Sequence, residues 1–557
     1  MIKKTAAIVR PLNHSQTGTS LGFSGSLRQN NFMKRLFYPK IPTGFRVLGC
    51  LFIHAGLGLL PMLCHAETPQ AIRFTVEKFS VEGEVPVSSD IISAYLQTLQ
   101  HRQFNLQELQ AASSGLEQII REQGYAFYRV IVPPQTLNSG EVKFKIVSFA
   151  LGEVAIEGNH YFDKQNILIS LPSLNTNASP NMESIAAELK VANKHPSKQL
   201  QLTFKPSETQ DNIDAKVTIR EQRPYQASLI FNTVGTKTSG NIRMTGALQH
   251  SNVWGLDHII NASYTTSPDH ADSVQQYGTS YSLPLYALGG WLNSYYAYSN
   301  VNNGTVGSFS VTGSGEMYGI HYQQHLPRLA RYEHWLEVGL DNRYFTNDIK
   351  FQNIPVGSNV RSTPVTVLYK AEYPWQTANF TYQVQWLGNA GIGDYNSQMD
   401  YSRTRSAATQ NWNVLRYGSS FSYAIQQWLI QTQFSAQYSG DSLIAGEQLG
   451  VGGSYDVRGY QERETSADSG EIIKVEITTP AWQKVNLFAF YDYGHGYSNN
   501  ALPGSLRDWH LSSAGVGANW QWQDHIQAKI AVANALNDAV STQAGDARIH
   551  ASIVVRY

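Results

Sequence analysis

Residues 225–557 alternate apolar and polar side chains with a period of two, and this alternation constrains the fold more than any other feature of the chain. Successive residues of a β-strand point to opposite faces, so the pattern predicts strands with one apolar and one polar face. The stretch "WLIQTQFSAQYSG" is an example. One face carries Trp428, Ile430, Thr432, Phe434, Ala436 and Tyr438, and the other carries Gln431, Gln433, Ser435 and Gln437.

The alternation continues in "HWLEVGLDNR" and "EIIKVEITT". A soluble β-sandwich alternates too, but the polar faces here are rich in Gln, Ser and Asn instead of Lys and Glu, and only 15% of the chain is charged. At about 20 residues for a strand with its connection, residues 225–557 supply about 16 strands, within the range of outer-membrane barrels. We therefore expect an all-β transmembrane barrel of about 16 antiparallel strands.

The final strand supports the barrel interpretation. In "RIHASIVVRY" one face is apolar, and the chain ends on an aromatic residue. This ending resembles the signal by which outer-membrane proteins are recognised for insertion, although Tyr stands where Phe is usual. The apolar face consists of Ile549, Ala551, Ile553, Val555 and Tyr557.

An export signal precedes the strands. Basic residues lead into the apolar run Val47–Leu63, which is followed by the small residue Ala66. These are the parts of a secretory signal peptide. A transmembrane helix is the alternative, but the run is short for the about 20 residues that span a bilayer, and His54 and Pro61 interrupt it. We expect a signal peptide with an extended leader over residues 1–66.

Cleavage after Ala66 leaves a mature chain without cysteine, because Cys50 and Cys64 both lie in the leader. Translation starts at Met1 or at Met33, and the sequence leaves both open. No other apolar run is long enough to span a membrane as a helix. A membrane location therefore requires a closed barrel, whose strands satisfy every backbone hydrogen bond.

Composition and motifs argue against nucleic-acid binding and catalysis. Lys and Arg number 42 and so do Asp and Glu, so the chain lacks the basic excess of nucleic-acid binders. "GGSYD" fails the nucleophile-elbow pattern because Asp456 replaces the second glycine. Neither a phosphate loop nor a metal-binding spacing of His or Cys occurs. We expect no catalytic residues, no metal and no cofactor.

The region before the strands contains two copies of one small α+β module, over residues 72–148 and 150–222. In the first copy, "SSDIISAYLQTLQ" predicts a helix capped by Ser89 or Asp90. "NLQELQAASSGLEQIIREQGY" predicts a second helix that stops at Gly124. Its helical face carries Leu106, Leu109, Leu116 and Ile120. The order is strand, helix, helix, strand, strand, and it recurs from "GEVAIEGN" to "NIDAKVTIRE" before the barrel begins at residue 225.

An arginine stands in a glycine-rich stretch of the barrel, "VGGSYDVRGYQERE". Further along, "VNLFAFYDYG" places Asp492 on the face opposite Leu487 and Tyr491, so its carboxylate points into the lumen. A carboxylate inside a barrel needs a partner, and Arg458 on an inward-folded loop is able to supply two hydrogen bonds. An exposed loop arginine and a solvated aspartate are the alternative.

The loop Val457, Arg458, Gly459 and Tyr460, followed by Phe490, Asp492 and Gly494 as F-x-D-x-G, resembles the superfamily of outer-membrane polypeptide transporters that carry POTRA domains. Within it the chain is similar to the two-partner secretion transporters, the TpsB family. "VPPQTLNSGEVKFKIV" resembles the segment that closes the first POTRA domain, "GEVAIEGNHYF" the start of the second, and "HSNVWGLDH" the first barrel hairpin.

The resemblance implies two periplasmic POTRA domains, a 16-stranded barrel in the bacterial outer membrane, and a lumenal loop that Arg458 anchors to Asp492. Its implied partners are a secreted exoprotein with an N-terminal secretion domain, outer-membrane lipid, and the barrel-assembly machinery during biogenesis of a monomer. It does not identify the cargo, or whether the cargo is released. Many members carry an N-terminal plug helix, for which cleavage near Ala66 leaves no room, so either the plug is absent or the signal peptide ends elsewhere; the sequence does not decide whether a plug exists. An insertase of the same superfamily is the alternative function. A plain porin or adhesin is a further alternative, but it would have no use for the two periplasmic modules.

Overall fold

The computed structural model describes residues 73–557, apart from residues 137–139, 237–238, 302–303, 307–308, 312–313, 330, 347–349, 352–353, 356–357 and 502–505. The signal peptide and leader expected over residues 1–66 lie outside the described residues. The described chain divides into two compact units, of which one ends at Ala150 and the other runs from Leu151 to Tyr557. No described helix is both long enough and apolar enough to cross a membrane.

The first unit is a small α+β module with its own core. Its parallel pair β2–β5 is extended by the antiparallel strand β4, and β1 pairs with β3. Asn105 and Glu108 form a reciprocal capping box at the start of α2. The elements are β1 (Phe74–Val76), β2 (Lys78–Glu82), α1 (Ser89–Gln97), β3 (Arg102–Phe104), α2 (Leu106–Glu122), β4 (Tyr128–Ile131) and β5 (Glu141–Ser148).

Three details of this module differ from the sequence expectations. The N-cap of α1 is Ser88, one residue earlier than predicted. Leu106 is 63% exposed, because it is the first residue of α2 and points away from the core that Leu109, Leu116 and Ile120 enter. The short strand β3 between the two helices was not predicted, since three residues are too few for a periodicity to be recognised.

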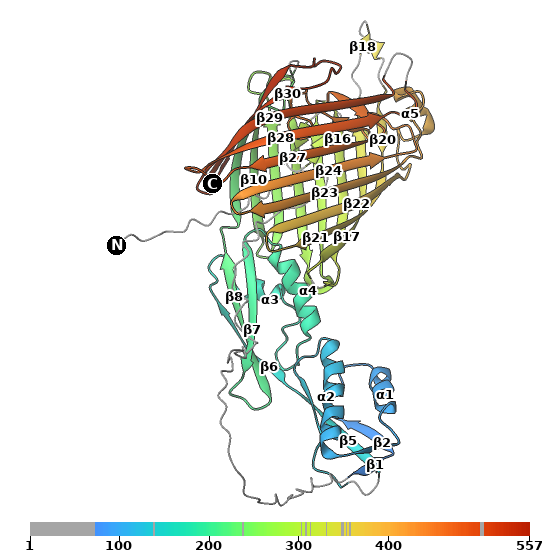
Figure 1. Cartoon of the computed structure of the whole chain (residues 1–557), viewed down its shortest axis with the longest axis vertical. Helices are drawn as coiled ribbons and strands as arrows, with labels where there is room; N and C mark the ends of the chain where they lie inside the picture. Colours follow the sequence, from blue (N-terminus) through green and yellow to red (C-terminus); the bar gives the residue numbers. More distant parts are fainter. Residues whose placement is uncertain are drawn as a thin grey trace, which may run out of the picture. The chain divides into compact units, whose positions relative to one another are not determined.

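The second module belongs to the same compact unit as the barrel. Its sheet has the order β6-β8-β7, and α4 lies against the short-turn end of the barrel, as Figure 1 shows. Its elements are β6 (Ala150–Glu157), α3 (Lys164–Ile169), α4 (Met182–Asn193), β7 (Lys198–Pro206) and β8 (Asn212–Glu221).

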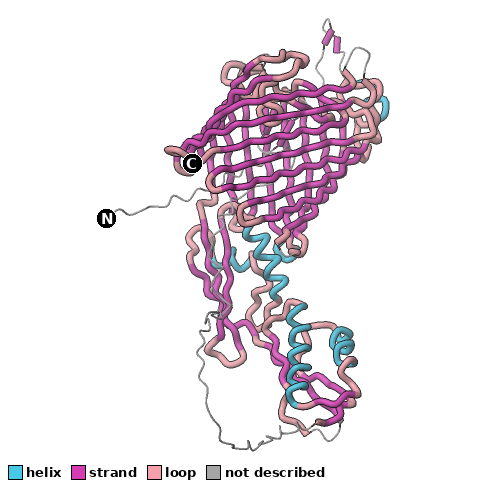
Figure 2. Tube along the Cα trace, viewed as in Figure 1, coloured by secondary structure: helices cyan, strands magenta, loops and turns pink. Residues whose placement is uncertain are grey.

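The remaining strands form a closed antiparallel barrel of 16 strands, as the alternation predicted (Figure 2). Both β20 and β21 pair with β17 and are separated by Thr363 alone, so they make one interrupted wall strand. The wall consists of β9 (Tyr225–Asn232), β10 (Arg243–Val253), β11 (His258–Thr266), β12 (Gln276–Leu285), β13 (Gly290–Ser299), β16 (Gly315–His325), β17 (Glu333–Phe345), β20 (Val360–Ser362), β21 (Pro364–Pro374), β22 (Ala378–Asn389), β23 (Asn413–Ile425), β24 (Trp428–Tyr438), β27 (Ser469–Thr478), β28 (Val485–Tyr497), β29 (Asp508–Trp522), β30 (Ile526–Ala535) and β31 (Ala547–Arg556).

The connections hold short elements of their own. Besides η1 (Tyr286–Leu288) and α5 (Gln398–Thr404), the loops contain the pairs β14 (Gly304–Val306) with β15 (Phe309–Val311), β18 (Lys350–Phe351) with β19 (Ile354–Pro355), and β25 (Leu449–Val451) with β26 (Thr465–Ala467). The longer connections lie at the end of the barrel away from the second module. This asymmetry of short turns and long loops is typical of outer-membrane barrels.

The two faces of the wall differ as the alternation requires. On β17, Leu336, Val338 and Leu340 are exposed on the outside, whereas Glu337 and Asp341 are buried on the lumen side. Exposed tryptophans gather at the short-turn end, next to the connections between paired strands. They are Trp254, Trp375, Trp428, Trp482, Trp520 and Trp522, while Trp386 is exposed towards the other end of β22. An apolar outer band edged by aromatic side chains suits a wall that faces lipid.

Candidate functional site in the barrel lumen

Residues 439–468, between β24 and β27, fold back into the lumen, and we call this segment the lumenal hairpin. β25 and β26 pair within it, and the "VRGY" residues lie between these two strands. Gly452 has a φ of 117° and Gly453 a φ of 102°, conformations that L side chains rarely adopt. The two glycines of "VGGSYD" therefore turn the chain at the tip of this hairpin.

The structure brings Arg458 and Asp492 together. Nε of Arg458 donates to Oδ2 of Asp492 at 2.7 Å, and Nη2 donates to Oδ1 at 2.8 Å. The Arg458 backbone N–H also donates to Oδ2, at 3.2 Å. Arg458 is 4% exposed and Asp492 is 0% exposed, so the pair is a bidentate ion pair shielded from water.

Two further groups hold Arg458; Phe490 was singled out as a motif residue, but neither contact was predicted. Its Nη1 donates to Oε2 of Glu476 on β27 at 2.9 Å. The guanidinium carbon lies 3.3 Å from the centroid of the Phe490 ring, so the F-x-D-x-G motif supplies a stacking face as well as a carboxylate. Lys529 on β30 reaches Glu476 at 3.4 Å. The alternation had placed Glu476 on the polar face of its strand, but nothing in the sequence paired it with Arg458.

The other motif residues surround this contact. Val457 and Tyr460 are both fully buried and pack in one apolar cluster against the wall. The Gly459 N–H donates to Nε2 of His550 at 3.0 Å, and the Tyr460 hydroxyl lies 2.9 Å from the Ser512 carbonyl oxygen. At Gly494 an added Cβ would lie 2.6 Å from Cγ1 of Val451, so the wall has no space there for a side chain.

The second module is joined to the barrel by a separate buried polar cluster at the short-turn end. The Lys198 ammonium donates to the carboxylate of Asp257, which lies in the turn between β10 and β11, and both side chains are fully buried. Asn166 Nδ2 donates to Oδ1 of the same carboxylate at 2.9 Å, and the Tyr286 hydroxyl donates to Oδ2 at 2.5 Å. Breaking a buried pair of this kind on one side costs about 3–5 kcal/mol.

His195 completes this cluster. Its Nε2 contacts the Ser251 carbonyl oxygen, and its Nδ1 accepts from the Ser197 N–H at 3.2 Å. Burial lowers the pKa of His195 to about 4, with the nearby Asp257 carboxylate opposing this shift and the Lys198 ammonium adding to it. The imidazole is therefore neutral at pH 7.

The contacts of the lumenal hairpin and of the Lys198–Asp257 cluster are hydrogen bonds, ion pairs and apolar packing. Among the described residues, no group of three or more His, Cys, Asp or Glu side chains is placed to hold a metal ion. The lumenal contacts join a hairpin to a wall through reversible hydrogen bonds and ion pairs. Ser454 of the hairpin also contacts the wall, with its hydroxyl 2.8 Å from Nδ1 of His550 on β31.

A lipid-facing barrel of 16 strands with an inward-folded hairpin and an α+β module before it defines an outer-membrane barrel protein of the POTRA class. The sequence profile described as "Haemolysin secretion/activation protein ShlB/FhaC/HecB" matches residues 211–520, and that of the "POTRA domain, ShlB-type" matches residues 74–148. The chain therefore belongs to the ShlB/FhaC/HecB family of haemolysin secretion/activation proteins, the two-partner secretion transporters. It is an outer-membrane protein with its POTRA domain in the periplasm.

Individual relatives agree with this assignment. The chain is 20% identical over 435 residues to the outer membrane transporter CdiB of Dickeya dadantii, with 75% of each chain covered. It is 19% identical over 506 residues to the heme/hemopexin transporter protein HuxB of Haemophilus influenzae, with 86% of each covered. The structure of CdiB from Escherichia coli superimposes with a TM-score of 0.69 at 17% identity, covering 88% of this chain and 92% of that one, and shares its fold.

Proposed function

We propose that this chain exports a large unfolded exoprotein through its barrel and that the lumenal hairpin is the part that moves. The observation that carries the proposal is the way the hairpin is held. Arg458 binds the wall through side-chain contacts to Asp492, Glu476 and Phe490, and the strands of the wall pair without it. The hairpin is able to leave while the barrel stays closed.

The α+β modules at residues 72–148 and 150–222 act as two POTRA domains that capture the cargo. Their sheets end on strands that pair on one side only within the described chain, namely β2, β4, β6 and β7. Such edges accept an extended peptide by main-chain hydrogen bonding. This mode suits an unfolded cargo because it does not depend on side-chain identity. The proposal includes no enzymatic step and no cofactor. Folding of the exoprotein outside opposes its return.

The genes that flank this one are first searched for a large exoprotein with an N-terminal secretion domain, and secretion of that exoprotein tests the proposal. We expect the exoprotein at the cell surface or in the medium only when this chain is present, and its retention in the periplasm otherwise. Arg458→Met removes the charge and leaves Asp492 buried without its partner, which costs about 3–5 kcal/mol. We expect it to lower secretion at least tenfold while the barrel still migrates as a heat-modifiable species.

A charge exchange separates anchoring from general disruption. Arg458→Asp with Asp492→Arg places a carboxylate next to Glu476, so the exchange alone should not restore secretion. Adding Glu476→Gln should restore part of it, and Glu476→Gln by itself is the matched control. Wild-type secretion by Arg458→Met would refute the anchoring role. Loss of other outer-membrane proteins together with this chain would instead indicate an insertase.

A further inference from the structure

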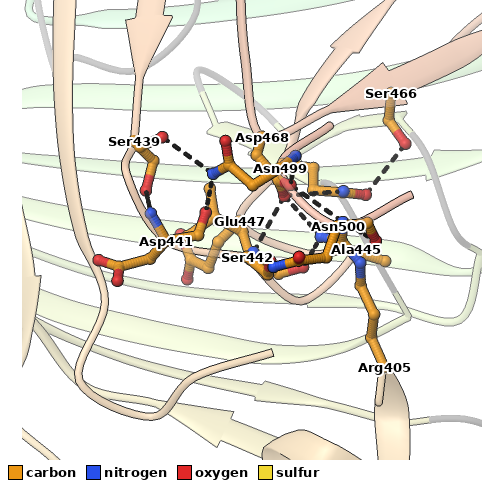
Figure 3. Close-up of polar contacts among 12 residues, drawn as sticks. Arg405, Ser439, Asp441, Ser442, Ala445, Glu447, Ser466, Asp468, Asn499 and Asn500 are labelled. Atoms are coloured by element: carbon orange, nitrogen blue, oxygen red, sulfur yellow. Dashed lines mark hydrogen bonds and ion pairs between the residues drawn. The ribbon is translucent and has the colours of Figure 1, made fainter. Parts of the chain in front are cut away.

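A second group of contacts holds the lumenal hairpin at its base, where it leaves the wall. Asp468 is the last residue of the hairpin and is fully buried. Arg405 donates to both of its oxygens, from Nη1 to Oδ1 at 2.5 Å and from Nη2 to Oδ2 at 2.9 Å. Figure 3 draws these contacts. The pair lies outside the "VRGY" and F-x-D-x-G motifs.

The carboxylate of Asp468 accepts further hydrogen bonds from two loops, the first part of the hairpin itself and the loop between β28 and β29. The Leu443 N–H donates to Oδ1 at 3.0 Å, and so does Nε2 of Gln448, also at 3.0 Å. The Asn499 N–H donates to Oδ2 at 2.9 Å from the loop between β28 and β29. A single buried charge therefore ties the start of the hairpin to its end, and ties both to neighbouring loops.

Arg405 reaches this carboxylate from a rigid support. It follows α5 in the loop between β22 and β23, and its Nη1 also donates to the Leu443 carbonyl oxygen at 2.7 Å. Tyr401 on α5 is fully buried in one apolar cluster with Leu443 and Ile444 of the hairpin. The guanidinium thus contacts both ends of the hairpin while its own backbone is fixed by packing.

The first part of the hairpin, before β25, forms a buried ion pair with the wall as well. Glu447 is fully buried, and its Oε2 accepts from Nη1 of Arg343 on β17 at 2.8 Å. Nη2 of Arg416 on β23 lies 3.9 Å from the same oxygen. These strands are different from β27 and β28, which hold Arg458. The hairpin is therefore held to separate parts of the barrel at its tip and near its base.

We propose that Arg405 and Asp468 are positioning residues of the transporter, forming a base clamp that holds the hairpin in its resting place in the lumen. The clamp rests on the proposed function, in which movement of the hairpin opens the pore. Since the tip and the base are held by different wall elements, release of Arg458 alone leaves the hairpin pinned. Loss of the clamp removes one of these attachments, loosens the base and raises the fraction of time for which the pore conducts.

Ion conductance of the purified full-length protein in planar lipid bilayers measures this without any cargo. Arg405→Met removes a bidentate charged hydrogen bond, and we expect about a tenfold rise in the open fraction. Arg405→Lys keeps the charge but loses the planar fork, so its rise should be smaller. Arg403→Met, a change at an exposed residue in the last turn of α5, is the matched control and should record as wild type.

Heat-modifiable migration checks that each barrel is folded. If Arg405 served only to stabilise the fold, its variants would change this migration, but the open fraction would not rise in the order Arg403→Met, Arg405→Lys, Arg405→Met. If Arg405→Met fails to fold, Arg405→Lys against Arg403→Lys decides the question with the same readout. An open fraction equal to wild type in the folded Arg405 variants overturns the clamp. If the wild-type chain exports no exoprotein, the proposed function is wrong. A raised open fraction of the Arg405 variants would still show that Arg405 helps to keep the pore closed.

Discussion

At the scale of single residues, the lumen selects arginine over lysine at position 458. The guanidinium meets two oxygens of Asp492, one of Glu476 and the face of Phe490 at the same time. An ammonium group is a point charge without a fork or a flat face, so it cannot satisfy these partners together. A charge buried this deeply is tolerated because its partners surround it.

Gly494 shows how closely the hairpin fits the wall. An added Cβ would approach Val451 Cγ1 to 2.6 Å and Val457 Cγ2 to 3.0 Å. We expect Gly494→Ala to destabilise the folded protein by about 1–3 kcal/mol through overpacking. Val451→Ala in the same chain should recover part of that loss, because it removes the nearer methyl group.

Thermal unfolding of the detergent-purified protein measures this effect. Gly440→Ala is the matched control, since an added Cβ at Gly440 meets nothing within 4 Å. A Gly494→Ala protein as stable as the Gly440→Ala protein would show that the hairpin yields at this point.

At the scale of elements, the second module contacts the turn between β10 and β11 through charged side chains. The sequence did not predict that these side chains pair. Lys198 begins β7, and Asp257 lies in the turn after β10. The alternation predicted the strands on either side, because a period of two follows from strand geometry alone. It carries no information about which turn a charged side chain meets across the fold. The same limit explains why Glu476 and Arg405 were missed, whereas a known motif pointed to Arg458.

The buried cluster at this junction predicts a pH dependence. The pKa of His195 is lowered to about 4 in the folded protein, mainly by burial, against about 6.5 when unfolded. Between these values the unfolded state binds more protons, so stability rises with pH across this window. The contribution of His195 is therefore complete above pH 6.5 and is lost as the pH falls towards 4.

Calorimetry of the full-length protein in detergent from pH 4.5 to 7.5 tests this. We expect the transition temperature to be level above pH 6.5 and to fall below it. In His195→Gln the decline between pH 6.5 and 4.5 should be shallower, with the remaining slope belonging to Asp257 and the other carboxylates. Equal slopes in the two proteins would assign the whole dependence to groups other than His195.

At the scale of the whole molecule, the first module forms one compact unit, and the second module and the barrel form another. This division predicts what happens when the first module is deleted. The first unit ends at Ala150, and its core is formed by its own residues.

Deletion of residues 72–147 should therefore leave an assembled barrel and abolish export. The barrel should keep its heat-modifiable migration and its conductance, because both depend on residues after Leu151. Exoprotein should accumulate in the periplasm, since the cargo has lost one of the two modules that offer it a strand edge. The comparison is with a chain carrying Leu106→Gln, which alters only an exposed residue of that module and should secrete normally. Normal secretion by the deleted chain would show that capture needs residues 150–222 alone, whereas a barrel that fails to assemble would place the first module in biogenesis.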